Sequence, residues 1–393
     1  MAAVMMLVVC GAVAGLSTVP AAVAAFSVVT STAASWSVVE NFGVGRLFVW
    51  GDNSSGQLGL GDRTERRSPT QAGSSTTWTR IAVGRAHTCA RQSTGTLWCS
   101  GSNTYGQLGL GNTTDTINYT QAGVATTWSR VVAGENHTCA TWNNGTLRCW
   151  GRNNAGQLGL GDTANRTSPV QVGSDNGWVG PTAGAEHTCG VRRQRTLWCW
   201  GSNAFGQLGL GDTTNRTSPV QVGTNTTWSA VAAGSAHNCA IRKDRTLWCW
   251  GSNASGQLGL GDTTNRTTPV QVGTNTTWAS VTGGAAHTCA IRSNGVLWCW
   301  GSNASGQLGL GDTTNRTTPV QVGTATTWAS VTGGAAHTCA VGAAQTVWCW
   351  GNNATGQLGQ GNTTNRTSPV QVPGVTGRPL ATGPTASSVL LIG

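Results

Sequence analysis

The residues whose chemistry is easiest to specify in this 393-residue chain are its thirteen cysteines. Twelve of them form six pairs whose members are ten residues apart, namely Cys89 with Cys99, Cys139 with Cys149, Cys189 with Cys199, Cys239 with Cys249, Cys289 with Cys299, and Cys339 with Cys349. Each pair flanks a short turn, so the two sulfurs can face each other across adjacent strands. Val39 and Val49 replace both members together in the first repeat. We therefore predict six disulfides, which persist in oxidising compartments.

Two other uses of these cysteines stay open at this point. The sulfurs can be free thiols in a core, or they can join His87 in a zinc site, although the close C-x-x-C spacing of zinc proteins is missing. The histidines also repeat, at His87, His137, His187, His237, His287 and His337. Because a residue present in six copies is more often structural than catalytic, we interpret these rings as buried scaffold. We expect no catalytic residue, no metal and no cofactor.

A second repeated pair consists of an acid and, four residues later, an arginine, as in Asp262 and Arg266. The acid recurs at Asp62, Asp162, Asp212, Asp262 and Asp312, and the arginine at Arg66, Arg166, Arg216, Arg266, Arg316 and Arg366. One interpretation is local: the carboxylate accepts hydrogen bonds from loop amides and pairs with the arginine. The alternative is a ring of arginines that holds an anionic partner.

Recognition is expected where the copies differ, since residues shared by all copies serve the scaffold. The candidate binding residues are the basic turns and the aromatics that break the pattern, namely Arg192, Arg193, Arg195, Arg242, Lys243, Arg245, Tyr105, Tyr119 and Trp142. The basic turns predict an anion-binding patch on the face opposite the Asp/Arg loops. An ordinary solvated turn is the competing interpretation. The net charge of +10 permits acidic glycans, acidic proteins or nucleic acid as partners.

These residues must be positioned by a repeated unit, because Gly-Gln-Leu-Gly recurs every 50 residues from Gly56 to Gly356. In the unit that begins at His287, alternation and turns predict strands over 287–291, 296–300, 320–322 and 328–332, with a long loop over 301–319. Four strands in each of seven units predict an all-β, seven-bladed β-propeller. Tryptophans repeat at two positions of the unit, and we interpret both as core or blade-interface residues.

The ends of the chain raise the question of how the ring closes. Residues 37–39 and 387–389 both resemble the His-Thr-Cys strand, and both map to the same blade position. We expect the N-terminal copy to pair there, because it continues directly into Leu47. The expected domains are then a signal peptide at 1–25, the propeller at 26–386, and a tail or extra edge strand at 387–393.

The first 35 residues carry no charged side chain and end their apolar run in Ala22-Val23-Ala24-Ala25. This pattern is typical of a cleaved signal peptide, and an uncleaved membrane anchor is the main rival. Dense N-x-S/T sequons predict a glycoprotein, although an Asn/Thr-rich repeat also produces sequons by composition; examples are Asn112, Asn136, Asn144, Asn225 and Asn275. We expect a secreted or cell-surface location.

The unit H-T-C-A-I-R-S-N-G-V-L-W-C-W-G-S-N-A-S-G-Q-L-G-L-G-D resembles the repeat of the regulator of chromosome condensation (RCC1) family. The resemblance covers residues 37–386 and implies a seven-bladed propeller. The founding member of the family is a nuclear exchange factor for a small GTPase that docks on nucleosomes. Other members bind varied partners, so the resemblance predicts the fold better than the activity.

The sequence favours a non-enzymatic extracellular or cell-surface interaction propeller, monomeric, with a protein or anionic glycan as partner rather than nucleic acid. The alternative is an RCC1-type guanine-nucleotide exchange factor or chromatin-binding protein. The even 50-residue spacing leaves no room for the wedge-like insertion that the resemblance would require for exchange. A third class, a lyase or hydrolase, requires a cluster of non-repeating carboxylates, which the sequence lacks.

Overall fold

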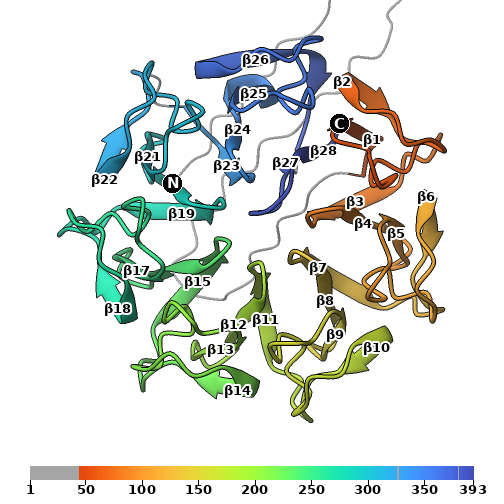
Figure 1. Ribbon diagram of the computed structural model, residues 1–393, viewed down its shortest axis with the longest axis horizontal. Helices are drawn as coiled ribbons and strands as arrows, with labels where there is room; N and C mark the ends of the chain where they lie inside the picture. Colours follow the sequence, from red (N-terminus) through yellow and green to blue (C-terminus); the bar gives the residue numbers. More distant parts are fainter. Residues whose placement is uncertain (1–43, 325–326, 379) are drawn as a thin grey trace, which may run out of the picture. The chain divides into compact units, whose positions relative to one another are not determined.

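The computed structural model describes residues 44–324, 327–378 and 380–393, and these residues form 28 β-strands and one short 3-10 helix. The strands make seven four-stranded antiparallel sheets, which lie around a ring (Figure 1). The seven-bladed propeller predicted from the 50-residue period is therefore confirmed. Within the described residues, no helix is long and apolar enough to cross a membrane.

Six blades take all four strands from one stretch of chain, from an innermost first strand to an outermost fourth strand (Figure 1). The first two blades contain β3 (Trp78–Val83), β4 (His87–Gln92), β5 (Leu97–Gly101), β6 (Thr116–Gln121), β7 (Trp128–Ala133), β8 (His137–Trp142), β9 (Leu147–Gly151) and β10 (Arg166–Gln171). The next two contain β11 (Trp178–Ala183), β12 (His187–Arg192), β13 (Leu197–Gly201), β14 (Arg216–Gln221), β15 (Trp228–Ala233), β16 (His237–Arg242), β17 (Leu247–Gly251) and β18 (Arg266–Gln271). The last two contain β19 (Trp278–Gly283), β20 (His287–Arg292), β21 (Leu297–Gly301), β22 (Arg316–Gln321), β23 (Ser330–Gly333), β24 (His337–Val341), the 3-10 helix η1 (Ala343–Gln345), β25 (Thr346–Gly351) and β26 (Arg366–Thr376).

The seventh blade is a composite of the first two and the last two described strands. It combines β1 (Leu47–Gly51) and β2 (Arg66–Gln71) with β27 (Leu380–Ala381) and β28 (Ser388–Ile392), in the order β2-β1-β28-β27. The expectation that residues 387–393 form a tail or an extra edge strand is therefore wrong, because β28 is a central strand with neighbours on both sides. The expected N-terminal copy at 37–39 lies outside the described residues.

The register of β28 explains why the sequence was ambiguous there. Ser388 lies opposite Gly51, where other blades have a histidine, and Leu390 lies opposite Val49, where other blades have a cysteine pair. The C-terminal copy is thus shifted by one residue from the 50-residue period. Five consecutive pairs over Leu47–Ile392 to Gly51–Ser388 and buried apolar side chains on both strands hold this closure.

The outermost strands begin earlier than the sequence indicated. The fourth strand of one blade spans Arg316–Gln321, where a loop was expected up to Pro319. Its ladder to β21 is interrupted between Gly301 and Cys299, and Pro319 lies within that irregular stretch. An edge strand tolerates proline at such a place because the missing N–H would face away from the sheet.

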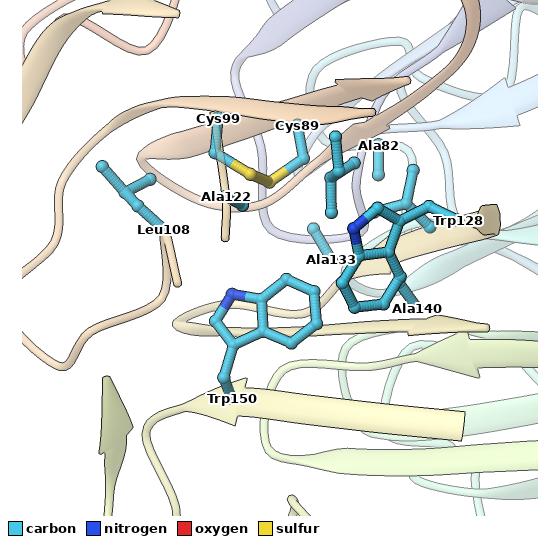
Figure 2. Packing of buried hydrophobic residues seen from close by; sticks show 11 residues of the cluster. Ala82, Cys89, Cys99, Leu108, Ala122, Trp128, Ala133, Ala140 and Trp150 are labelled. Carbon is cyan, nitrogen blue, oxygen red and sulfur yellow. A yellow bond between two sulfur atoms is a disulfide. The ribbon is translucent and has the colours of Figure 1, made fainter. Parts of the chain in front are cut away.

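Tryptophans fill the spaces between neighbouring blades, as expected for core residues. Figure 2 shows Trp128 and Trp150 beside the Cys89–Cys99 disulfide of the preceding blade, in one cluster of buried side chains. The Trp150 indole N–H donates to the Gln107 carbonyl oxygen at 2.9 Å. Gly109 has a φ of +72°, and a Cβ there would lie 2.8 Å from Trp150 Nε1, so only glycine allows this close contact.

The alternating strand directions give the propeller two faces of different construction. The loop face carries the long Gly-Gln-Leu-Gly loops between third and fourth strands, such as residues 202–215, and the short loops after the innermost strands. The turn face carries the hairpin turns between second and third strands, such as residues 193–196, and the connectors from blade to blade. The basic turns and the Asp/Arg loops therefore lie on opposite faces, as the strand alternation indicated.

Candidate functional site

All six predicted disulfides are present, one in each blade that is built from a single stretch of chain. They join Cys89 to Cys99, Cys139 to Cys149, Cys189 to Cys199, Cys239 to Cys249, Cys289 to Cys299, and Cys339 to Cys349. The paired cysteines lie directly opposite each other on the second and third strands, with Cα atoms 4.1 Å apart. This is the spacing of an antiparallel pair that exchanges no backbone hydrogen bonds, where side chains come closest.

The cross-links decide between the three uses that the sequence left open for these sulfurs. Sulfurs bonded to each other are neither free thiols nor thiolate ligands, so the core-thiol alternative and the zinc alternative with His87 are both wrong. Among the described residues, no three His, Cys, Asp or Glu side chains are grouped to hold a metal ion. The cysteines therefore serve the scaffold of each blade.

The repeated histidines link one blade to the next. His287 Nε2 lies 3.0 Å from Thr338 Oγ1 in the following blade, and Thr338 Oγ1 donates to the Gln307 carbonyl oxygen at 2.7 Å. Since the hydroxyl has given its one hydrogen to that carbonyl, it accepts from His287, which fixes the proton on Nε2. The same bridge recurs from His87 to Thr138, from His137 to Thr188 and from His237 to Thr288.

This arrangement keeps the rings neutral. Every repeated histidine is fully buried, and its Nδ1 has no hydrogen-bond partner among the described residues. Burial lowers the pKa of His87, His187 and His287 to about 4, and that of His137, His237 and His337 to about 3. Protonation would place a charged N–H in a dry site without an acceptor. The histidines are therefore scaffold, in agreement with the sequence interpretation.

The chain of bridges ends at the composite blade. His337 is buried, but its Nε2 has no partner within the described part of the chain. The one-residue shift of β28 brings Val389 to the position that Thr338 holds in the preceding blade. Valine has no hydroxyl to accept the bond, so the seam lacks the polar link found between other blades.

The repeated Asp and Arg residues stabilise the loops that carry them. Asp262 accepts hydrogen bonds from the Thr264 backbone N–H and from Asn253 Nδ2, and Arg266 lies 2.5 Å away. The Thr264 N–H and the Arg266 guanidinium lower the pKa of the Asp262 carboxyl. Five blades repeat this pair at 2.5–2.6 Å. The local interpretation is therefore correct, and a free ring of arginines is wrong for these five positions. Arg366 differs, because Asn362 replaces its acid.

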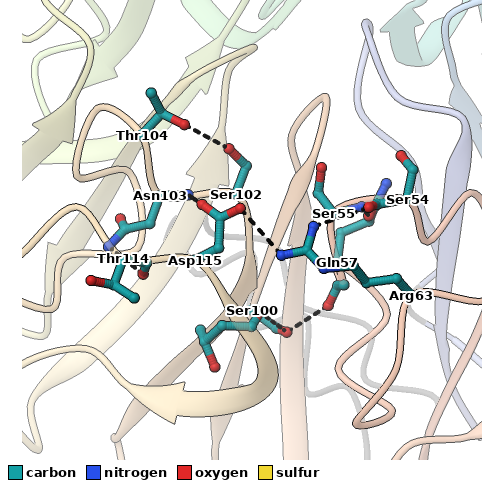
Figure 3. A network of polar contacts seen from close by, with 12 residues as sticks. Ser54, Ser55, Gln57, Arg63, Ser100, Ser102, Asn103, Thr104, Thr114 and Asp115 are labelled. Atoms are coloured by element: carbon teal, nitrogen blue, oxygen red, sulfur yellow. Dashed lines mark hydrogen bonds and ion pairs between the residues drawn. The ribbon is translucent and has the colours of Figure 1, made fainter.

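Further ion pairs tie neighbouring loops together on the loop face. Figure 3 shows Arg63 beside Asp115 of the next blade, at 3.5 Å, while Asp115 also accepts the Asn103 backbone N–H. Arg85 pairs with Glu135 at 2.7 Å, again across two blades. These pairs leave little of the loop face's positive charge uncompensated.

The predicted basic turns divide into half-buried and exposed members. Arg193, Lys243 and Arg245 are exposed, and Arg195 is half-buried. Arg195 and Arg245 have φ values of 60° and 62°, where other blades have Gly95, Gly145 and Gly295 at the same turn position. The arginines therefore hold the turn in a strained conformation, and a glycine at the same position would relieve the strain.

Arg192 and Arg242 are structural residues rather than surface contacts. The Arg242 guanidinium carbon lies 4.7 Å from the Trp228 ring centroid and 3.7 Å from that of Trp248. Arg192 stacks in the same way on Trp178 and Trp198, and it also pairs with Asp175 at 2.9 Å. Sequence reasoning missed these contacts between one arginine and two indole rings. The available signal was the constant pair of tryptophans that flanks this arginine in the repeat.

The three irregular aromatics are also placed by the fold. Tyr119 is partly buried against Trp78, its hydroxyl lies 3.0 Å from Thr88 Oγ1, and burial raises its pKa. It packs on Gly59 as Trp150 packs on Gly109, because Ser100 replaces the tryptophan of its own blade.

Trp142 and Tyr105 take part in cation–π contacts. Trp142 packs on Trp128, and Arg148 lies 4.0 Å over the Trp142 ring. Tyr105 is half-buried, with Arg152 5.3 Å from its ring centroid. Tyr119 and Trp142 both pack on tryptophans of the fold, and a binding role for any of the three aromatics stays a prediction.

Charge is segregated between the two faces. Within the part of the chain that the structure describes, the loop face carries ten basic and ten acidic residues and is balanced. The acidic residues on the turn face, within the described chain, are Asp175 and Asp244. The basic residues on that face, or in the half of a strand nearest to it, are Arg46, Arg80, Arg91, Arg130, Arg148, Arg192, Arg193, Arg195, Arg242, Lys243, Arg245, Arg292 and Arg378. Among the described residues, the excess of basic over acidic side chains therefore lies entirely on the turn face.

Comparison with known families agrees with this architecture. A family model described as an RCC1-like domain matches residues 14–283, which is more than half of the chain. Models of the regulator of chromosome condensation (RCC1) repeat match residues 278–307, 294–341 and 346–382. The chain belongs to the RCC1-like family. No curated protein sequence matches this RCC1-like chain.

Solved structures similar to this RCC1-like propeller include human WBSCR16, with a TM-score of 0.81 and 20% identity over 88% of this chain and 98% of that one. Prp20p from Saccharomyces cerevisiae has a TM-score of 0.79 and 20% identity over 89% of this chain and 92% of its own. That structure was described with its binding properties to Gsp1p and histones. At this identity the likeness establishes the shared fold and leaves the partner open.

Proposed function

We propose that this RCC1-like protein is a non-enzymatic extracellular interaction propeller that holds an anionic partner against its turn face. The observation that carries the proposal is the segregation of charge. Among the described residues, thirteen basic and two acidic ones belong to the turn face, while the loop face is balanced. Such a one-sided field attracts and orients an anionic surface, and it weakens with ionic strength.

The exposed members of the basic turns provide the contact points. Arg193 lies in the β12–β13 turn, and Lys243 and Arg245 lie in the β16–β17 turn of the adjacent blade. Asp244 stands beside them, but its Oδ1 accepts both the backbone N–H and the hydroxyl of Thr246. One of its two carboxylate oxygens is therefore engaged by its own turn, and the three exposed cations outnumber this single acid as contacts for carboxylate or sulfate groups.

An extracellular location is supported by the cysteines. Six buried disulfides suit an oxidising compartment and would be reduced in most cytosols. The leader proposed at 1–25 lies outside the described residues. The repeated His and Asp side chains are committed to the scaffold contacts described above, which supports a binding protein rather than an enzyme.

The test is retention on a heparin column by a triple variant, Arg193→Ser, Lys243→Ser and Arg245→Gly. Each substitution introduces the residue that another blade has at that position, namely Ser93, Ser293 and Gly295, so the turns are expected to fold. The matched control removes three positive charges from the loop face, Arg63→Thr, Arg67→Thr and Arg85→Ala. We expect the turn-face variant to elute at clearly lower salt than the control. Equal elution of the two variants would refute the turn-face assignment.

The rival hypothesis of an intracellular exchange factor or chromatin-binding protein predicts reduced cysteines. Titration of free thiols in the native protein, denatured without reductant, separates the two hypotheses. A value near zero for the paired cysteines supports the extracellular proposal. Twelve free thiols would contradict it and favour the intracellular alternative.

A further inference from the structure

One slot on the turn face recurs from blade to blade and is filled in different ways. It lies between the tryptophan that precedes or begins the first strand and the tryptophan of the third strand. In three successive blades an arginine from the end of the second strand fills it. The Arg292 guanidinium, for example, lies 4.9 Å from the Trp278 ring centroid and 4.0 Å from that of Trp298.

Two other blades fill the same position with different side chains. In the β7–β10 blade, Trp142 takes the place of the arginine and Arg148 that of the third-strand tryptophan; Trp142 packs on Trp128, with ring centroids 6.0 Å apart. Gln92 takes it in the β3–β6 blade, where its amide reaches Ser75 Oγ at 3.4 Å. In the β23–β26 blade this position is Gly342, which has no side chain to enter the slot.

The slot of the β23–β26 blade is consequently an open cavity of about 340 Å³. Its walls are formed by Val322, Trp328, Gly342, Thr346, Trp348 and Pro369. The corresponding residues around the arginine-filled slot of the β15–β18 blade are Val222, Trp228, Arg242, Thr246, Trp248 and Pro269. Among these six positions the residue type differs at one, where glycine replaces arginine; a further lining residue, Ala343, corresponds to Lys243.

The aromatic frame keeps its form without the arginine. The Trp328 and Trp348 rings are 6.2 Å apart at 83°, and the Trp228 and Trp248 rings around Arg242 are 6.5 Å apart at 84°. Trp348 Nε1 donates to Thr346 Oγ1 at 3.1 Å, as Trp248 Nε1 donates to Thr246 Oγ1 at 2.8 Å. The open slot is therefore preorganised in the geometry that holds a guanidinium elsewhere in the same molecule.

The chemistry of this frame selects the class of ligand. The faces of two indoles carry negative electrostatic potential and attract a cation, and a planar guanidinium also stacks on them. Arg242 and Arg292 show that the frame accepts a guanidinium between its rings in this fold. We propose that the slot between Trp328 and Trp348 binds an arginine side chain presented by a partner protein.

This site is separate from the basic turns and does not depend on them. Trp328 and Trp348 belong to the β23–β26 blade, whereas Arg193, Lys243 and Arg245 lie in the β11–β14 and β15–β18 blades. A partner that bridges both would present acidic groups to the turns and one arginine to the slot. Loss of heparin retention in the turn variant and loss of arginine binding at the slot can therefore be observed independently.

The test is an NMR titration with acetyl-arginine-amide, observed through the indole N–H signals of the tryptophans. We expect saturable shifts of the Trp348 and Trp328 signals at millimolar ligand. Acetyl-citrulline-amide has nearly the same shape without the charge, and we expect it to bind at least tenfold more weakly. Equal binding of the two ligands would overturn the proposal, and so would tighter binding of tetramethylammonium than of the arginine ligand.

Three variants assign the signal to the slot. Gly342→Arg supplies an internal guanidinium and should abolish the titration. Residue 342 has a φ of −93°, and a Cβ there lies 3.2 Å from Thr346 Oγ1, so a small shift of the hydroxyl accommodates it. Trp348→Leu removes one wall by an independent route and should also abolish binding. Arg242→Gly opens the corresponding slot and should add a second set of shifting signals, from Trp228 and Trp248.

The remaining indole signals report whether each variant is folded. Unchanged titration in both Gly342→Arg and Trp348→Leu, with those signals retained, would place arginine binding elsewhere and refute the assignment. Failure of Arg242→Gly to create a second site would show that the aromatic frame alone does not determine the ligand.

Discussion

The six buried histidines predict a steep dependence of stability on pH. Their pKa values are about 4 or 3 in the folded protein, against about 6.5 in an unfolded chain. Between these values the unfolded chain binds protons that the folded protein excludes. The histidine contribution to the free energy of unfolding is therefore largest above pH 6.5, falls as the pH drops toward 4, and levels off below the folded pKa values.

The magnitude follows from a single ring. For His287, a folded pKa of about 4 means that lowering the pH from 7 to 5 costs about 2 kcal/mol of unfolding free energy. If the six rings act independently, the total reaches roughly 10 kcal/mol, which is comparable to the whole stability of an ordinary domain. Protons bound by the unfolded chain in this range belong to histidine, because the carboxylates titrate at lower pH.

Urea unfolding with the disulfides intact, followed by tryptophan fluorescence at pH 7, 6 and 5, measures this dependence. The variant His287→Gln keeps an amide donor for Thr338 but cannot titrate, so its loss of stability from pH 7 to 5 should be smaller by about 2 kcal/mol. An identical pH dependence in the two proteins would refute the reasoning. So would an NMR titration of the folded protein that shows imidazole pKa values near 6.5.

Three further predictions concern packing and cross-links. Replacing Cys289 and Cys299 by alanine should lower the free energy of unfolding by roughly 3 kcal/mol, because the bond closes a short loop in the unfolded chain, and urea unfolding checks this. Tyr119→Phe should cost about 1 kcal/mol for the lost hydrogen bond with Thr88, whereas Tyr119→Ala should cost about 3–5 kcal/mol for the cavity, so equal effects would contradict the packing role. Arg242→Ala should cost roughly 1–2 kcal/mol through the lost stacking on Trp228 and Trp248, while Lys243→Ser beside it should change stability by under about 0.5 kcal/mol in the same measurement.

Much of the fold follows from the period of the sequence. Gly-Gln-Leu-Gly every 50 residues sets the number of blades, and cysteines ten residues apart set the pairing of second and third strands. These features were predictable because each copy repeats the same local chemistry. Where the copies lose that chemistry, the prediction failed. Residues 380–392 have lost the His, Thr and Cys of the repeat, so nothing in their sequence revealed the one-residue shift that makes β28 a central strand.

The candidate site shows the same limit. The exposed cations Arg193 and Lys243 were found because they break the repeat. Arg192 and Arg242 were grouped with them, since a sequence does not show that a long side chain folds back between two tryptophans. Tyr119 looked like a surface aromatic. It fills the space that the missing tryptophan at Ser100 leaves, and this packing joins parts of the chain that are distant in sequence. The open slot can be found by comparing the residues that correspond to Gly342 in the six blades, but only once the two tryptophans around this position are known from the structure.

The composite blade closes the ring by the pairing of β1 with β28, and this closure differs in construction from the other blades. It joins β1 to β28 through backbone hydrogen bonds and the apolar pair Val49 and Leu390, and among the described residues no disulfide crosses it. Denaturant should therefore open the propeller at the β1–β28 pairing first, while reductant alone should leave that pairing intact. After opening, six disulfides still hold the second and third strands of six blades together.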